Sequence, residues 1–245
     1  MLERANRHAD GDLVHLGGAQ VRLRVSRRAR RVSLRLDRAS GEVLAIAPSA
    51  RRLGEAAAFA HERRDWIAER LAAAPAARRF APGGEIELFG QSCRLGHAPG
   101  RASLEGRGWE RGLRLPHRAD ETLYAHAVVQ LVRREARAWF EGRCETYCRA
   151  IGQPTPPVSI MDARTRWGSC TPAQRGRAAS IRFSWRLALA PPEVADYVAA
   201  HECAHLLEAN HGPRFWDHVR RLIGDERPHR AWLRHEGQAL HGYGR

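Results

Sequence analysis

The sequence contains no lysine, so arginine supplies all 41 of its basic residues other than histidine. It also has no run of about 18 or more apolar residues, so no transmembrane helix is expected. The N-terminal segment Met1–Arg7 lacks the apolar stretch and the small-residue cleavage site of a secretory signal peptide. The five cysteines are odd in number and irregularly spaced, which argues against a disulfide framework. These absences together predict a cytoplasmic protein with no membrane partner.

Aromatic residues are also scarce, at 7% of the chain, whereas the formal net charge is +14. A surface of this charge attracts anions, nucleic acid included. Eight arginines lie between Arg22 and Arg38, opposed by the single acid Asp37. Two interpretations stay open for them: a solvated face of a twisted hairpin, or a phosphate-binding patch. The first is favoured because no aromatic side chains interleave with these arginines to stack on bases.

The hydrophobic pattern divides the 245-residue chain into two regions. Residues 1–120 alternate like short strands, with a hairpin turn at Gly17-Gly18 and one helix expected over 53–74. Residues 121–245 predict a long helix over 121–150, strands over 158–161 and 181–185 around a turn at Arg166–Cys170, and a helix from Pro191-Pro192. The predicted fold class is α+β, with a β-rich N-terminal region at 1–120 followed by a compact domain at 121–245.

The most informative stretch is His201-Glu202-Cys203-Ala204-His205. On a helix, residues four apart lie on the same face, so the two imidazoles can converge on one metal ion. This geometry suits two ligands of a tetrahedral zinc. Glu202, one position further round the helix, cannot ligate the same ion but can reach a water molecule bound to it, where a general base is needed.

A third ligand must come from outside this helical face. His211 lies ten residues after His201, which on a continuous helix is off the shared face. It can join the metal only if the helix ends first, and Asn210 and Gly212-Pro213 are suitable residues for a break. The alternative is Asp225, whose carboxylate could reach the site from the next helix. His211 is the favoured third ligand.

Several segments together resemble the YgjP-like family of bacterial predicted zinc metallopeptidases, relatives of the SprT-like proteases. The similar segments are Arg166–Cys170, Ser184–Leu187, Ala190–Glu193, Asp196–Val198, His201–His205, Asn210-His211 and Phe215-Trp216, with weaker similarity in the first half. The resemblance implies a zincin-type metallopeptidase domain at 121–245 with an active-site helix. It also implies a metal held by His201, His205 and His211, with Glu202 as the catalytic acid and base.

The expected mechanism uses a zinc-activated water molecule. Glu202 would take a proton during the attack on the scissile carbonyl and deliver it to the leaving amine. Three further side chains are candidates for stabilising the oxyanion or contacting the substrate: Arg166, Tyr197 and His218. The strand expected over 181–185 could pair with an extended peptide substrate if it lies at a sheet edge.

Two other functions stay open. Arg166 and the arginine excess would suit a metal-dependent hydrolase of nucleotides or phosphorylated small molecules. A basic N-terminal region with weak affinity for nucleic acid would suit a DNA-associated protease. In the leading interpretation the partner is a peptide or protein substrate, and the sequence does not indicate an oligomeric state.

Overall fold

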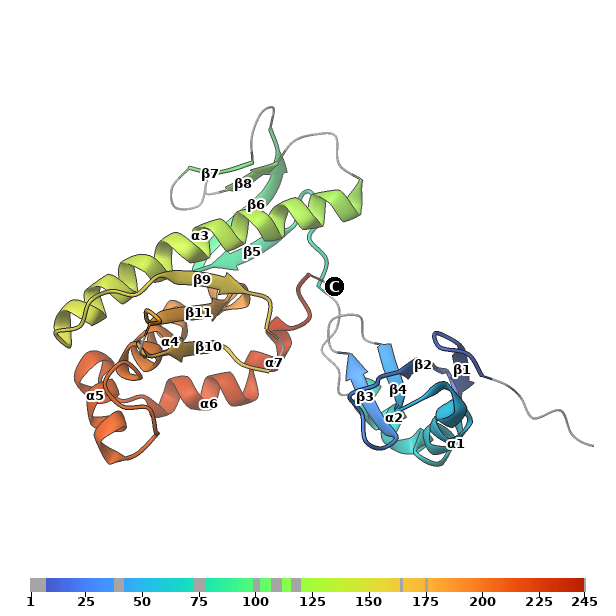
Figure 1. Ribbon diagram of the computed structural model, residues 1–245. Helices are drawn as coiled ribbons and strands as arrows, with labels where there is room; N and C mark the ends of the chain where they lie inside the picture. Colours follow the sequence, from blue (N-terminus) through green and yellow to red (C-terminus); the bar gives the residue numbers. More distant parts are fainter. Residues whose placement is uncertain are drawn as a thin grey trace, which may run out of the picture. The chain divides into compact units, whose positions relative to one another are not determined.

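A computed structural model describes residues 8–37, 42–72, 78–98, 102–106, 112–115, 120–163, 165–174 and 176–244 (Figure 1). Its contacts divide the chain into two compact units, Met1–Ala76 with Arg245, and Ala77–Gly244. This division lies well before residue 120, where the hydrophobic pattern changes. The assignment of domains 1–120 and 121–245 stays a prediction.

The N-terminal unit is a four-stranded sheet with helices packed against it. Its strands are β1 (Leu13–Leu16), β2 (Ala19–Val25), β3 (Ser33–Asp37) and β4 (Glu42–Ala47), in the order β1-β2-β4-β3. Gly17 and Gly18 form the tight turn between β1 and β2 with φ of 52° and 92°, values that side chains disfavour and glycine tolerates. Alternate residues of β2 and β4, including Val21, Leu23 and Ala45, are buried against the helices.

The helix expected over 53–74 is two helices in the structure. A 3₁₀ turn (Ala50–Arg52) leads into α1 (Leu53–Glu62), and α2 (Arg64–Ala72) follows after Arg63. No proline causes this break. The change of direction at Arg63 allows Ile67 of α2 to share one apolar cluster with Ala60 of α1, and both side chains are fully buried. Tertiary packing therefore interrupts an alanine-rich helical pattern. Residues 73 and 74 lie outside the described part of the chain.

The second unit begins with another sheet, which packs on a long helix. Its strands are β5 (Glu85–Leu88), β6 (Gln91–His97), β7 (Ser103–Glu105) and β8 (Gly112–Leu115), in the order β5-β6-β8-β7. Helix α3 (Glu121–Ala150) starts at Asp120, whose Oδ1 accepts a hydrogen bond from the Leu123 backbone at 2.8 Å. Leu113 and Leu115 of β8 belong to the same apolar cluster as Tyr124 of α3, so this sheet and α3 share one core.

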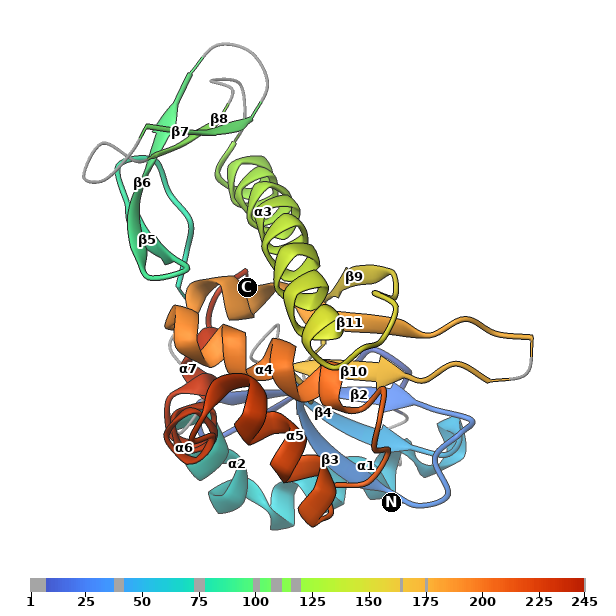
Figure 2. The ribbon, with the colours of Figure 1, turned by 90° about the vertical axis from the view of Figure 1, so that its left-hand side faces the viewer.

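A three-stranded sheet and four helices complete the second unit. The strands β9 (Val158–Met161), β10 (Gly168–Thr171) and β11 (Ser180–Ser184) are arranged in the order β10-β11-β9. A 3₁₀ segment (Trp185–Leu189) precedes α4 (Pro192–Ala204), α5 (Pro213–Ile223), α6 (Arg227–His235) and α7 (Gly237–Leu240). Helix α4 packs against α3, α5, α6 and β10 (Figure 2).

One expectation about this sheet is wrong, and the condition on another, that its strand lies at a sheet edge, is not met. The segment expected as a turn, Arg166–Cys170, contains most of the strand β10. The strand expected over 181–185 corresponds to β11, which lies in the centre of the sheet, so its two sides are already occupied by β9 and β10. It therefore cannot pair with a substrate. The edge strand next to α4 is β10.

The α+β fold class is confirmed, with the N-terminal sheet followed by a helix-rich region. The five cysteines all lie in the described part of the chain, and none of them forms a disulfide. Within the described residues, no helix combines the length and the apolar character needed to cross a bilayer.

Candidate metal centre

The last turn of α4 carries His201 and Glu202, and His205 follows directly at the end of the helix. The rings of His201 and His205 have centroids 5.0 Å apart, as expected for residues one helical turn apart. Helix α4 ends at Ala204, earlier than Asn210 and Gly212-Pro213 suggested. The backbone N–H of Leu206 donates to the Cys203 carbonyl at 3.0 Å, which tightens the chain into a turn directly after the helix.

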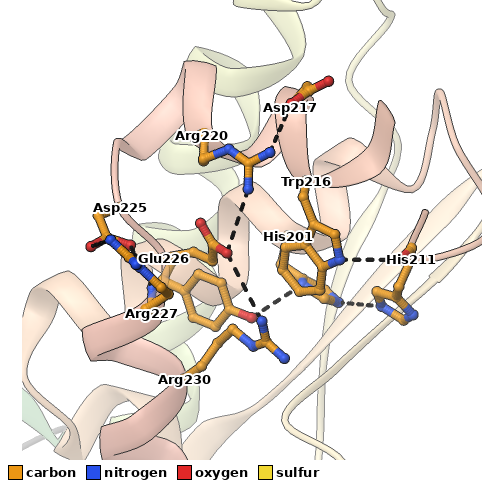
Figure 3. Close-up of polar contacts among 10 residues, drawn as sticks. His201, His211, Trp216, Asp217, Arg220, Asp225, Glu226, Arg227 and Arg230 are labelled. Atoms are coloured by element: carbon orange, nitrogen blue, oxygen red, sulfur yellow. Dashed lines mark hydrogen bonds and ion pairs between the residues drawn. The ribbon is translucent and has the colours of Figure 1, made fainter. Parts of the chain in front are cut away.

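This turn brings His211 back to the exposed side of His201. The Nε2 atoms of His201 and His211 are 3.1 Å apart (Figure 3). One potential ligand atom from each of His201, His205 and His211 lies within 4.8 Å of the others. Two nitrogen atoms bound to one tetrahedral zinc at 2.0–2.1 Å would be about 3.3 Å apart, close to the observed spacing. Trp216 of α5 donates its Nε1–H to the His211 carbonyl at 3.1 Å, which holds this part of the turn against α5.

The Nδ1 atoms of His201 and His205 also have hydrogen-bond partners. The Nδ1 atom of His205 is 3.0 Å from the Glu208 carbonyl, to which it can only donate, and this leaves Nε2 as the free lone pair. The Nδ1 atom of His201 lies 3.3 Å from the Tyr197 hydroxyl. Metal-bound histidines are oriented by hydrogen bonds of this kind, so the donor set fits a metal ion.

Burial favours the neutral form of His201 and His205. Burial, followed by the charges of His205, His211 and Arg230, lowers the pKa of His201 to about 3. Burial is also the main cause of the lowered pKa of His205. A metal ion binds the unprotonated imidazole, so a site that disfavours protonation has its ligands ready at neutral pH.

Glu202 is buried, with 5% of its surface exposed. Burial raises its pKa to about 8, against the opposing effects of a hydrogen bond from the Cys170 backbone and the positive charge of Arg166. Its side chain lies directly on the backbone of Gly168 in β10. A Cβ atom added there would be only 2.6 Å from Cγ and 2.7 Å from Cδ of Glu202. The carboxylate therefore occupies space that exists because residue 168 has no side chain.

Charged residues of α5, of α6 and of the segment between these helices lie beside His201 (Figure 3). Glu226 is buried, and its Oε1 atom lies 3.7 Å from Arg220 and 3.9 Å from Arg230. The guanidinium of Arg230 also lies 4.3 Å above the ring of Trp216, which is bonded to the His211 carbonyl. These contacts link both helices to the turn that carries the third histidine.

The other candidate residues lie in different surroundings. Asp225 is held by Arg227, with Oδ1 and Oδ2 at 2.8 and 2.9 Å from its guanidinium (Figure 3), and it is not part of the histidine group. Arg166 is exposed and close enough to Glu202 to lower its pKa. His218 is half-buried on α5 and is also outside the histidine group. Tyr197 is 5% exposed, with its hydroxyl at His201.

The sequence interpretation missed two features of the centre. It did not foresee the contact between Gly168 and Glu202, although the glycine in Arg166-Trp167-Gly168-Ser169-Cys170 was a signal that backbone approaches another group closely there. It also missed that Tyr197 contacts His201. The spacing of four residues on one helical face was the available signal for that contact.

A family model described as YgjP-like, metallopeptidase domain, matches residues 30–236. The match begins in the N-terminal unit and ends in α6, so it covers both units and most of the chain. No curated protein and no solved structure matches the chain.

Proposed function

The chain belongs to the YgjP-like metallopeptidase family, and from this premise we propose that it is a zinc-dependent peptidase. The observation that carries the proposal is the convergence of His201, His205 and His211 beside the buried carboxylate of Glu202. Three histidine ligands that leave a fourth position on the ion open are typical of catalytic zinc.

In this proposal His201, His205 and His211 hold the zinc ion. When bound, zinc supplies a Lewis acid that polarises the scissile carbonyl and lowers the pKa of a water molecule towards about 7. The hydrogen bonds of Nδ1 in His201 and His205 orient the two rings of α4. His211 is the exposed ligand and closes the site from the turn.

Glu202 acts as the general base and then as the general acid. Its carboxylate accepts a proton from the attacking water and returns it to the amine of the leaving peptide. Burial supports this role, because a carboxyl group with a pKa near 8 holds a proton well enough to deliver it. A nearby cation favours the ionised form, so the same group can begin the reaction as a base.

The substrate binds as an extended peptide along β10. The Ser184 backbone N–H donates to the Trp167 carbonyl at 2.8 Å, and hydrogen-bonded pairs alternate along an antiparallel ladder. The peptide groups of Ser169 and Thr171 therefore face β11, whereas those of Gly168 and Cys170 face the opposite edge. Because the Cys170 backbone also bonds to Glu202, a peptide paired with this edge lies beside the carboxylate.

Arg166 is the favoured candidate for stabilising the oxyanion or holding a substrate carbonyl. It is exposed, it precedes β10, and its charge acts on Glu202. Tyr197 is better suited to orienting His201, because its hydroxyl is already engaged by that ring and almost the whole residue is buried. A contact of His218 with the substrate stays a prediction.

The test compares three variants by zinc content and by cleavage of casein. Glu202→Gln should retain zinc and lose hydrolysis, because the amide keeps the shape of the side chain but cannot accept the proton. His211→Ala should lose both, whereas Asp225→Ala should retain both. If His211→Ala kept its zinc and Asp225→Ala lost it, the third ligand would be Asp225. Release of pyrophosphate from nucleoside triphosphates without peptide cleavage would support the nucleotide hydrolase instead.

A further inference from the structure

The N-terminal unit has a surface pocket of about 450 Å³ that is separate from the metal centre. Its walls are formed by residues 31–34, which lead into and begin β3, by Phe59 of α1 and Trp66 of α2, and by Arg63 between the two helices. We propose that this pocket binds an acidic peptide segment in an extended conformation, which adds a strand along β3. The binding does not depend on the proposed peptidase activity.

The backbone next to the pocket is suited to strand addition. Strand β3 lies at one edge of the sheet, where it pairs with β4 on one side (Figure 1). An edge strand presents N–H and C=O groups on its other side, and an added strand satisfies them. Ser33 and Leu34 belong both to this strand and to the lining of the pocket.

The charge of the pocket selects an acidic ligand. Arg31 and Arg63 are exposed, and neither forms an ion pair with any acidic residue in the described part of the chain. The exposed arginines Arg27, Arg28 and Arg30 precede Arg31 and extend the positive surface. A carboxylate placed between two guanidinium groups forms charge-assisted hydrogen bonds, which are stronger than neutral ones.

The apolar side chains favour a peptide over a nucleic acid. Val32, Leu34 and Trp66 are partly buried and pack on the core of the unit, so they form a firm surface for the alternate apolar side chains of a bound strand. The guanidinium of Arg63 lies 5.7 Å above the ring of Phe59, and that of Arg70 lies 5.5 Å above Trp66. One face of each ring is therefore already covered, which reduces the area available for stacking bases.

Fluorescence anisotropy with the full chain tests the proposal. The probe is a labelled peptide of about nine residues that alternates Glu and Leu, and a chelator prevents hydrolysis from affecting the result. Arg31→Glu/Arg63→Glu should weaken binding at least about tenfold, because both carboxylate contacts are lost and repulsion replaces them. Two further probes carry N-methyl groups at odd or at even positions, and one of them should bind at least about tenfold more weakly, because it cannot pair with β3.

The matched control is Arg51→Glu/Arg234→Glu, which makes the same change in net charge at two exposed residues outside the pocket. Its affinity should stay within about twofold of the wild-type value, since neither residue lines the pocket and exposed charges are screened by salt. Equal weakening by both double variants would overturn the proposal, as would absence of saturable binding. Tighter binding of an oligothymidylate that is lost in the pocket variant would assign the surface to nucleic acid instead.

Discussion

The position of Glu202, the proposed general base, can be tested by a substitution that leaves Glu202 itself unchanged. Gly168→Ala adds one methyl group to β10, and its Cβ would be 2.6 Å from Cγ and 2.7 Å from Cδ of Glu202. Carbon atoms in van der Waals contact are about 3.5–4.0 Å apart, so the Glu202 side chain must move by about 1 Å. The three histidines of the proposed zinc site do not border the added atom as closely, because the three nearest atoms all belong to Glu202.

A displacement of this size has a calculable effect on the rate. Misplacing a catalytic group by about 1 Å costs about 100-fold in rate, or about 2.7 kcal/mol in activation free energy. The kcat for peptide hydrolysis should therefore fall about 100-fold while zinc stoichiometry remains near that of the wild type. Overpacking should also lower the free energy of unfolding by about 1–3 kcal/mol. This loss is partly offset because alanine gives the unfolded chain less conformational entropy than glycine does.

The chain offers a matched control for this substitution. Gly142 lies within α3, and a Cβ added there would meet nothing within 4 Å. Gly142→Ala should leave kcat unchanged and stabilise the helix by about 0.5–1 kcal/mol. Steady-state hydrolysis of a quenched fluorescent peptide, with zinc content measured on the same samples, separates the two effects. If Gly168→Ala hydrolysed the peptide at the wild-type rate while Glu202→Gln was inactive, the contact with Gly168 would not control the position of the base.

Two other predictions follow from contacts in the second unit. Tyr197→Phe removes the hydroxyl next to Nδ1 of His201 and should weaken zinc binding about 10–100-fold in a competition assay with a chelator. The control Tyr147→Phe, which removes a hydroxyl bonded to Arg143, should not weaken it. Equal zinc affinities in the two variants would show that Tyr197 does not orient His201. Phe140 is fully buried and stacks on Phe183 with ring centroids 4.1 Å apart. Phe140→Ala should therefore lower the free energy of unfolding, measured by denaturant titration, by about 3–5 kcal/mol. A loss below about 1 kcal/mol would contradict the assignment of Phe140 to the core.

The local sequence was sufficient to predict the features set by neighbouring residues. The bounds of α3 follow from the Asp120 cap and the apolar periodicity, and the hairpin follows from Gly17-Gly18. The convergence of His201 and His205 follows from helical spacing alone. Each of these features needs information from only a few adjacent positions.

The features that were missed depend on contacts distant in the sequence. Strand β10 is four residues of glycine, serine, cysteine and threonine, without the alternation that predicts a strand, and it is extended because it pairs with β11. The end of α4 at Ala204 precedes the residues that favour a break. Leu206, directly after that end, packs on the core of the second unit, so burial of the turn, rather than Gly212-Pro213, decides where the helix stops.

This early end of α4 also explains why the proposed metal site needs no ligand from a second helix. Had α4 continued through His211, that ring would lie on a different face from His201, and the third ligand would have to come from another element such as Asp225. Instead the turn after Ala204 returns His211 to within 3.1 Å of His201, while Arg227 occupies both oxygen atoms of Asp225. The position of the helix end therefore favours the proposal that His211, rather than Asp225, is the third ligand.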